Sequence, residues 1–225
     1  MRAEKQNSET RKRQIARAAM SLIARQGMKG LSVAAVARKV GLVPSALYRH
    51  FKGKEKILEA TLELIQDLVM ENVRSVRQAS PLPLNQLKLL TLRHIQLIQE
   101  FQAIPRIVFS DEISSSYPQG RNAVYKIIRK ILGQVADIIE QGQRMGQIKP
   151  VLNPDAVSVI FLGLVQPPAI LWYLSKGKFD VSKHMEKAWP IFEKAVRVET
   201  PAAVSFKKGA SKKPQKNKEV MPCYL

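Results

Sequence analysis

Five neighbouring side chains near residue 50 have the types and the spacing that contact a DNA duplex. Ser45 can donate or accept a hydrogen bond at a base edge, Ala46 can touch a thymine methyl group, and Arg49 can form a bidentate contact with guanine. Tyr48 and His50 carry hydrogen-bond donors on flat rings, which suit phosphate oxygens. The first three would therefore select a base sequence, and the last two would position the protein on the backbone.

These side chains follow a pattern of two short helices joined by a tight corner. Ser32 precedes the apolar segment 33–40 and suits an N-cap, because its hydroxyl can accept a hydrogen bond from a free backbone N–H group. The corner is predicted at 41–43, and Pro44 suits the first turn of the next helix, which should end near Phe51. A unit of this kind places its second helix in the major groove while the first braces across the backbone.

Helical spacing separates the side chains of this unit into two faces. Apolar residues are expected to point inward: Val36, Val40, Leu42, Leu47 and Phe51. The residues expected to point outward are Pro44, Ser45, Ala46, Tyr48, Arg49 and His50. Lys54 begins the next helix, whose positive end adds to the attraction of its ammonium group for phosphate.

The charge of the chain is concentrated at its two ends. Overall, 37 lysines and arginines against 18 acids give a net charge of +19, which favours nucleic acid first and an anionic membrane second. Residues 1–56 hold 14 of these cations and 3 of the acids, and residues 197–225 hold 7 and 2. The basic cluster 11–13 fits phosphate contacts or a solvated helix face, and the tail lysines fit nonspecific DNA attraction or a solvating tail.

The run 41–51, together with Lys54, resembles the TetR/AcrR family of transcriptional regulators. The shared features are a glycine in the corner, small residues at the start of the second helix, a Leu-Tyr pair, a His-Phe pair and the following lysine. With Ser32, Val36 and Ala37 included, the resemblance covers residue 14 to about residue 62. It implies a homodimer of all-helical subunits, each with a small DNA-binding domain and a larger domain that binds an effector and dimerises.

The resemblance also implies roles for individual side chains. Backbone contacts would come from Ser32, Tyr48, His50 and Lys54, and the candidates near bases are Pro44, Ser45, Ala46 and Arg49. One position departs from the family pattern, in which a Ser or Thr commonly caps the second helix. Here the residue is Val43, so Ser45 or a phosphate must satisfy some of the free N–H groups.

Beyond residue 54 the apolar periodicity remains helical, and no segment sustains the alternation of a strand, so the sequence predicts an all-α fold. Helices are predicted at about 9–26, 54–78, 84–101, 103–111, 120–144, 154–175 and 181–196. We divide the chain into a helix-turn-helix domain over 1–53, a long connecting helix over 54–78, a helical ligand-binding and dimerisation domain over 79–198 and a disordered basic tail over 199–225.

Aromatic and polar side chains of the second domain are candidates for lining an effector pocket. The wider set is Phe101, Arg106, Phe109, Asp111, Glu112, Tyr117, Tyr125, Phe161, Gln166, Trp172 and Trp189, of which Phe109, Tyr125, Phe161, Gln166 and Trp172 are the predicted ligand-binding residues. Pro167 and Pro168 should kink or break helix 154–175, which would either build a cavity or shape a dimer interface. That helix and the one over 181–196 are the predicted dimer seam, as the final two helices are in the resembled family.

Several classes of protein are disfavoured. The single cysteine, Cys223, allows no internal disulfide and no cysteine-based zinc site, and the chain begins with no apolar run of signal-peptide type. The apolar stretch 157–174 is interrupted by Gln-Pro-Pro, so we expect a soluble cytoplasmic protein without a membrane partner. His94 and His184 lack metal-ligand spacing and no catalytic motif is present, so the sequence predicts no metal, no cofactor and no enzymatic activity.

Together these features predict a ligand-responsive regulator that binds double-stranded DNA. The simplest form is a repressor that binds an inverted-repeat operator as a homodimer and is released by a small, largely apolar effector. The alternative is a DNA-organising or protein-partnered DNA binder of the same fold that needs no effector.

Overall fold

The computed structural model describes residues 2–108 and 110–199, and these residues fold almost entirely into helices. The predicted all-α fold is confirmed, since the described residues contain no strand and one isolated antiparallel bridge, between Ile148 and Arg197. Phe109 and the predicted basic tail beyond residue 199 lie outside the described residues. The elements are α1 (Arg2–Gln26), a 3-10 turn η1 (Met28–Gly30), α2 (Val33–Lys39), α3 (Pro44–Tyr48), α4 (Lys54–Ala79), α5 (Pro83–Glu100), α6 (Ala103–Val108), α7 (Glu112–Ser116), α8 (Gly120–Arg144), α9 (Pro154–Gly163), α10 (Gln166–Leu174) and α11 (Val181–Val196).

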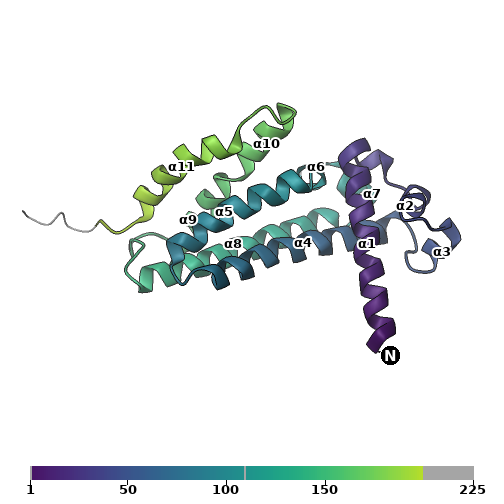
Figure 1. Cartoon of the computed structure of the whole chain (residues 1–225), viewed down its shortest axis with the longest axis horizontal. Coiled ribbons are helices and arrows are strands. Elements are labelled where there is room, and N and C mark those ends of the chain that lie inside the picture. The colour runs from purple at the N-terminus through teal and green to yellow at the C-terminus, as the bar shows by residue number, and fades with distance from the viewer. Residues whose placement is uncertain (1, 109, 200–225) are drawn as a thin grey trace, which may run out of the picture.

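Two long helices, α4 and α8, run side by side along the length of the molecule, and α5 lies along them (Figure 1). Helix α1 crosses α4 near its first turns, at the end of the molecule that carries α2 and α3. Helices α10 and α11 lie along the opposite side of α5 from α4 (Figure 1). The fold therefore separates a small helical unit at one end from a larger layered bundle, and α4 belongs to both.

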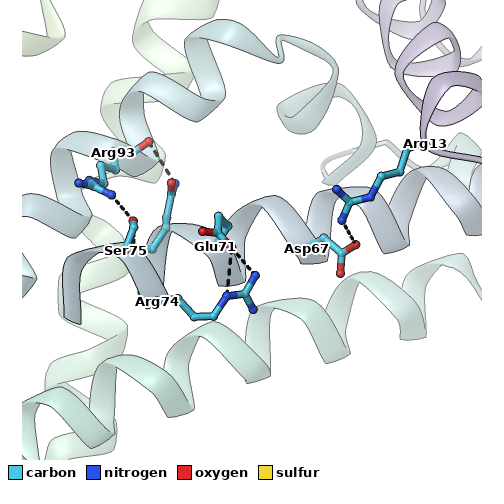
Figure 2. Close-up of polar contacts among 7 residues, drawn as sticks. Arg13, Asp67, Glu71, Arg74, Ser75 and Arg93 are labelled. Carbon is cyan, nitrogen blue, oxygen red and sulfur yellow. Dashed lines mark hydrogen bonds and ion pairs between the residues drawn. The ribbon is translucent and has the colours of Figure 1, made fainter. Parts of the chain in front are cut away.

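Apolar packing holds α1 on α4, and charged side chains flank that contact. Ile15 and Ile23 of α1 and Leu58 of α4 are fully buried, and burial of each such side chain stabilises the fold by roughly 1.5–3 kcal/mol. Arg13 donates to Asp67 across the two helices at 2.9 Å (Figure 2). The neighbouring residue of the predicted basic cluster, Lys12, pairs with Glu63, and this hydrogen bond raises the pKa of the lysine.

A second set of polar contacts joins α4 to α5. The Asn72 side chain donates to the backbone carbonyl of Arg93 at 3.2 Å, and the Arg93 guanidinium donates to the hydroxyl of Ser75 (Figure 2). These contacts lie about one to two helical turns beyond Asp67, so α4 pairs with α1 nearer its start and with α5 nearer its end.

Helix α1 begins earlier than the predicted residue 9, and two predicted helices of the larger bundle differ from those observed. The predicted helix 103–111 ends at Val108, and a separate helix α7 follows, because the Ser110 hydroxyl accepts a hydrogen bond from the Glu112 N–H and redirects the chain. The predicted helix 154–175 breaks into α9 and α10 just before Pro167 and Pro168, as expected of two residues without backbone N–H donors.

By length and composition alone, Pro154–Leu174 is apolar enough to span a membrane, and 33% of its most apolar 18 residues are buried in the fold. Apolar side chains remain exposed on these two helices and on the following helix α11, namely Val159, Ile160, Leu171, Leu174 and Ile191. In a folded chain that packs α9 against α8, such side chains mark a surface suited to a partner.

Candidate nucleic-acid interface and interior cavity

The α2–α3 unit forms from residues that fix its ends and its corner. The Ser32 hydroxyl accepts a hydrogen bond from the Ala35 N–H at 3.1 Å, so the predicted N-cap of α2 is confirmed. Gly41 adopts a φ of 71° in the corner, a left-handed conformation that disfavours side chains with a Cβ. Val43 precedes α3 without a side-chain cap, and Ser45 forms no capping bond in its place.

The two faces of α3 are as predicted. Leu47 is fully buried beside Val36 and Phe51, and this anchor turns the opposite face of the helix toward solvent. The outward residues are Pro44, Ser45, Tyr48, Arg49 and His50, which are exposed, and Ala46, which is half-buried. Helix α3 ends at Tyr48 and not at the predicted Phe51, so Arg49 and His50 leave from the turn that follows it.

Lys54 has an internal partner that the sequence did not reveal. Its ammonium donates to the backbone carbonyl of Met28 at 2.9 Å, and the side chain is half-buried. The contact ties the first residue of α4 to the turn after α1. An ammonium group has three donors, so this bond leaves two for a phosphate.

Further cations lie next to the α3 surface in a groove of about 540 Å³ between α1 and the start of α4. His50, Arg11 and Lys52 line this groove together with Lys56, whose ammonium pairs with Glu59. Lys52 is exposed and has no ion-pair partner among the described residues. Lys52 was not among the predicted DNA contacts, although its place in the sequence between His50 and Lys54 could have indicated it.

A small cavity of about 70 Å³, partly open to solvent, lies between the helices of the larger bundle. Its lining is almost wholly apolar and comes from helices far apart in the sequence, including Ile65, Ile98, Pro105, Ile131 and Ile170. A lining of this kind favours apolar groups. Two polar side chains, His94 of α5 and Gln166 of α10, also face this space.

His94 is an unsatisfied polar group at the wall of the cavity. Its Nδ1 is closed to solvent, and neither ring nitrogen has a hydrogen-bond partner among the described residues. The side chain keeps some accessible surface because its ring lines the cavity. Burial lowers its pKa from 6.5 to about 4, so the imidazole is neutral near pH 7 and offers one donor and one acceptor.

The predicted ligand-binding residues divide in the structure. Gln166 lines the cavity, whereas Phe161 packs edge-on against Phe192 in the core and Tyr125 is exposed on α8. Trp172 is half-buried and does not border the cavity, and Phe109 lies outside the described residues. His94 was not among the predicted ligand-binding residues; a histidine at a buried helical position among leucines and isoleucines is the signal that could have indicated it.

Across residues 2–108 and 110–199, no group of three or more His, Cys, Asp or Glu side chains is arranged to hold a metal ion.

Two family models match the chain. Residues 15–61 match the bacterial regulatory proteins of the tetR family, and residues 80–196 match the tetracyclin repressor-like C-terminal domain. The nucleoid occlusion factor SlmA of Vibrio vulnificus (strain YJ016) is 21% identical over 173 residues, which cover 76% of this chain and 88% of that protein.

Solved structures share the fold. A TetR-family transcriptional regulator from Rhodococcus sp. superposes with a TM-score of 0.68 at 26% identity, covering 82% of this chain and 99% of that one. The transcriptional regulator FadR from Bacillus subtilis, solved in complex with stearoyl-CoA, superposes with a TM-score of 0.67 at 21% identity, covering 80% and 96%.

Proposed function

We propose that this chain, which belongs to the tetR family of bacterial regulatory proteins, is a cytoplasmic repressor that a small, largely apolar effector releases from DNA. The observation that carries the effector step is the cavity of about 70 Å³, whose apolar lining is interrupted by two polar side chains, His94 and Gln166. A neutral donor and acceptor within an apolar wall is the arrangement that orients a mostly apolar ligand.

On the DNA side, the outward face of α3 would enter the major groove. Arg49 would read guanine, and Pro44, Ser45 and Ala46 would lie against neighbouring base edges. Phosphate contacts would come from Ser32, Tyr48, His50 and Lys54, with Lys52 added from its exposed position beside them.

The repressor would act as a homodimer. The apolar side chains exposed on α9, α10 and α11 support this assembly, because a two-fold axis there would bury this surface against the same surface of the second subunit. The two α3 helices would then enter successive major grooves about 34–36 Å apart on an inverted repeat.

Helix α4 would transmit the effector signal. Ile65 and Val69 of α4 line the cavity, and Lys54 begins the same helix beside Met28, about 16 Å away at the 1.5 Å rise of a helix. An effector that requires more room than this cavity offers would bind better to a conformation in which α4 has moved, and would shift the population away from DNA. The stearoyl-CoA bound to the similarly folded FadR supports an apolar effector for this fold.

The effector step is tested on the full-length protein with an operator selected from a pool of random duplexes. Fluorescence anisotropy would measure release of the labelled operator by a library of apolar compounds. Ala169 lines the cavity and is buried, so Ala169→Leu should keep operator affinity but raise the concentration of effector needed for release at least about tenfold. The matched control, Ala79→Leu at an exposed position of α4, should respond as the unmodified protein does. If no apolar compound releases the operator, the proposed effector step is wrong.

The relatives named as nucleoid occlusion factors favour a second candidate, a DNA-organising protein of the same fold that needs no effector. It predicts operator affinity that no small molecule changes, together with a protein partner captured by the DNA-bound dimer. The unsatisfied His94 at the cavity wall favours the effector-gated form.

A further inference from the structure

Arg106 of α6 is a cation without an anionic partner. The side chain is half-buried, its Nε is closed to solvent and has no acceptor, and no carboxylate lies within ion-pair distance among the described residues. The guanidinium lies 5.2 Å from the centre of the Tyr173 ring. Such a group retains unused donors in a fork that matches a carboxylate or a phosphate.

Arg106 faces a groove that adjoins the cavity. The groove measures about 480 Å³ and is lined by residues of η1, α6, α7 and α10, among them Met28, Arg106 and Tyr173. Pro105 and Ile170 line both the groove and the cavity, so the two spaces lie on either side of the same side chains. A ligand could therefore occupy both by displacing this thin wall.

The two spaces differ in charge. The cavity has no charged lining residue, since its polar groups are Gln166 and the neutral His94. In the groove, Arg106 faces one carboxylate, that of Glu112, which lies 3.9 Å from the ammonium of Lys29. An ion would be costly to bury in the first space and would find a cation in the second.

Arg106 also touches the DNA-binding end of the molecule. Its Nη1 donates to the backbone carbonyl of Ile23, in the last turn of α1, at 3.4 Å. The same carbonyl accepts the Gly27 N–H at 2.9 Å. A long hydrogen bond of this kind yields readily to a stronger, charge-assisted partner.

We infer that the effector is an amphiphile, whose apolar part fills the cavity and whose anionic group binds Arg106 in the groove and takes that side chain from the Ile23 carbonyl. The inference rests on the proposed function and adds the chemical class of the effector and the contact through which it reaches α1. Loss of the Arg106 bond removes a side-chain hydrogen bond that joins α6 to the last turn of α1, and the Ile23 carbonyl then accepts the Gly27 N–H alone. Gly27 adjoins Met28, whose carbonyl holds Lys54.

The test compares three probes with the same apolar chain: decanoate, decanoyl-CoA and decan-1-ol. Calorimetric titration of the full-length protein gives their affinities. Arg106→Gln should weaken the anionic probes about 10- to 100-fold and leave decan-1-ol within about twofold, because only the former use the guanidinium. The larger loss identifies the headgroup as carboxylate or phosphate. Arg129→Gln, the same charge change on an exposed face of α8, should alter none of the three.

Hydrogen exchange supplies a readout of the contact with α1. Decanoate or decanoyl-CoA should slow exchange of the Gly27 amide, because the Ile23 carbonyl then has one donor in place of two. Decan-1-ol should leave the rate unchanged, and Arg106→Gln should slow it without any ligand. If decan-1-ol binds as tightly as the anionic probes and Arg106→Gln changes no affinity, the inference is overturned while an apolar effector survives. If none of the probes binds, the inference is again overturned, and the proposed function is then judged separately by operator release with uncharged compounds.

Discussion

The α2–α3 surface is built from residues close together in the sequence, whereas the cavity is built from residues far apart in it. The predicted DNA contacts all come from residues 32–54, and one buried side chain, Leu47, sets the direction in which α3 faces. The cavity takes side chains from Ile65 to Ile170 and exists only while several helices keep their relative positions. DNA binding at the surface should therefore be sensitive to the loss of single contacts. Effector binding in the cavity should be sensitive to changes in the packing of the whole domain.

The largest expected effect is at the anchor of the surface. Leu47→Ala should lower the free energy of unfolding by about 2–5 kcal/mol, because the side chain is fully buried and its removal leaves a void. Ile170→Ala should cost less, since Ile170 already borders empty space and has fewer contacts to lose. Urea denaturation of the two variants measures both costs. If Ile170→Ala lowers the free energy of unfolding as much as Leu47→Ala or more, Ile170 is packed as tightly as Leu47 and does not border empty space.

Two cations divide the surface itself into reading and positioning roles. Arg49→Ala should cost about 1–3 kcal/mol on the selected operator and little on random DNA, because a bidentate contact to guanine is lost. Lys52→Ala should weaken both complexes equally and reduce the salt dependence of binding by about one charge. Affinities measured over a series of salt concentrations separate these outcomes. Equal losses on both DNAs for Arg49→Ala would remove that side chain from the sequence-reading set.

His94 should make the stability of the fold depend on pH. Its pKa is about 4 in the folded chain and 6.5 as a free side chain, so the unfolded chain takes up this proton first as the pH falls. Stability should therefore be lost between pH 6.5 and 4, by roughly 2 kcal/mol on going from pH 7.5 to 5.

His94→Gln should remove that part of the loss, and His184→Gln, at an exposed position of α11, should keep it. Urea midpoints of the three proteins at both pH values provide the measurement. If the stability of His94→Gln falls between pH 7.5 and 5 as much as that of the unmodified protein, His94 is not the source of this pH dependence.

Local patterns predicted the α2–α3 unit nearly in full, because its caps, corner and faces depend on residues within a few positions of one another. Ser32 as an N-cap and Leu47 as the inward residue are examples. The cavity could not be predicted in the same way. An isoleucine at helical spacing, such as Ile131, looks the same in sequence whether it meets another side chain or empty space. The internal partner of Lys54 likewise depends on where the turn at Met28 lies in three dimensions.

The smallest expected effect lies at the seam between the two regions, where Arg13 of α1 pairs with Asp67 of α4. The two side chains are 61% and 53% exposed, so solvent screens their attraction. A double-mutant cycle with Arg13→Gln and Asp67→Asn should give a coupling energy of about 0.2–1 kcal/mol that declines in high salt. A larger coupling that persists in high salt would mean that charge, and not the buried apolar contact of Ile15 and Ile23 with α4, holds the DNA-binding end on the bundle. In that case an effector could change the position of the DNA-binding end by disturbing one ion pair. The difference between a locally built surface and a cavity built from the whole domain would then no longer explain how the signal passes between them.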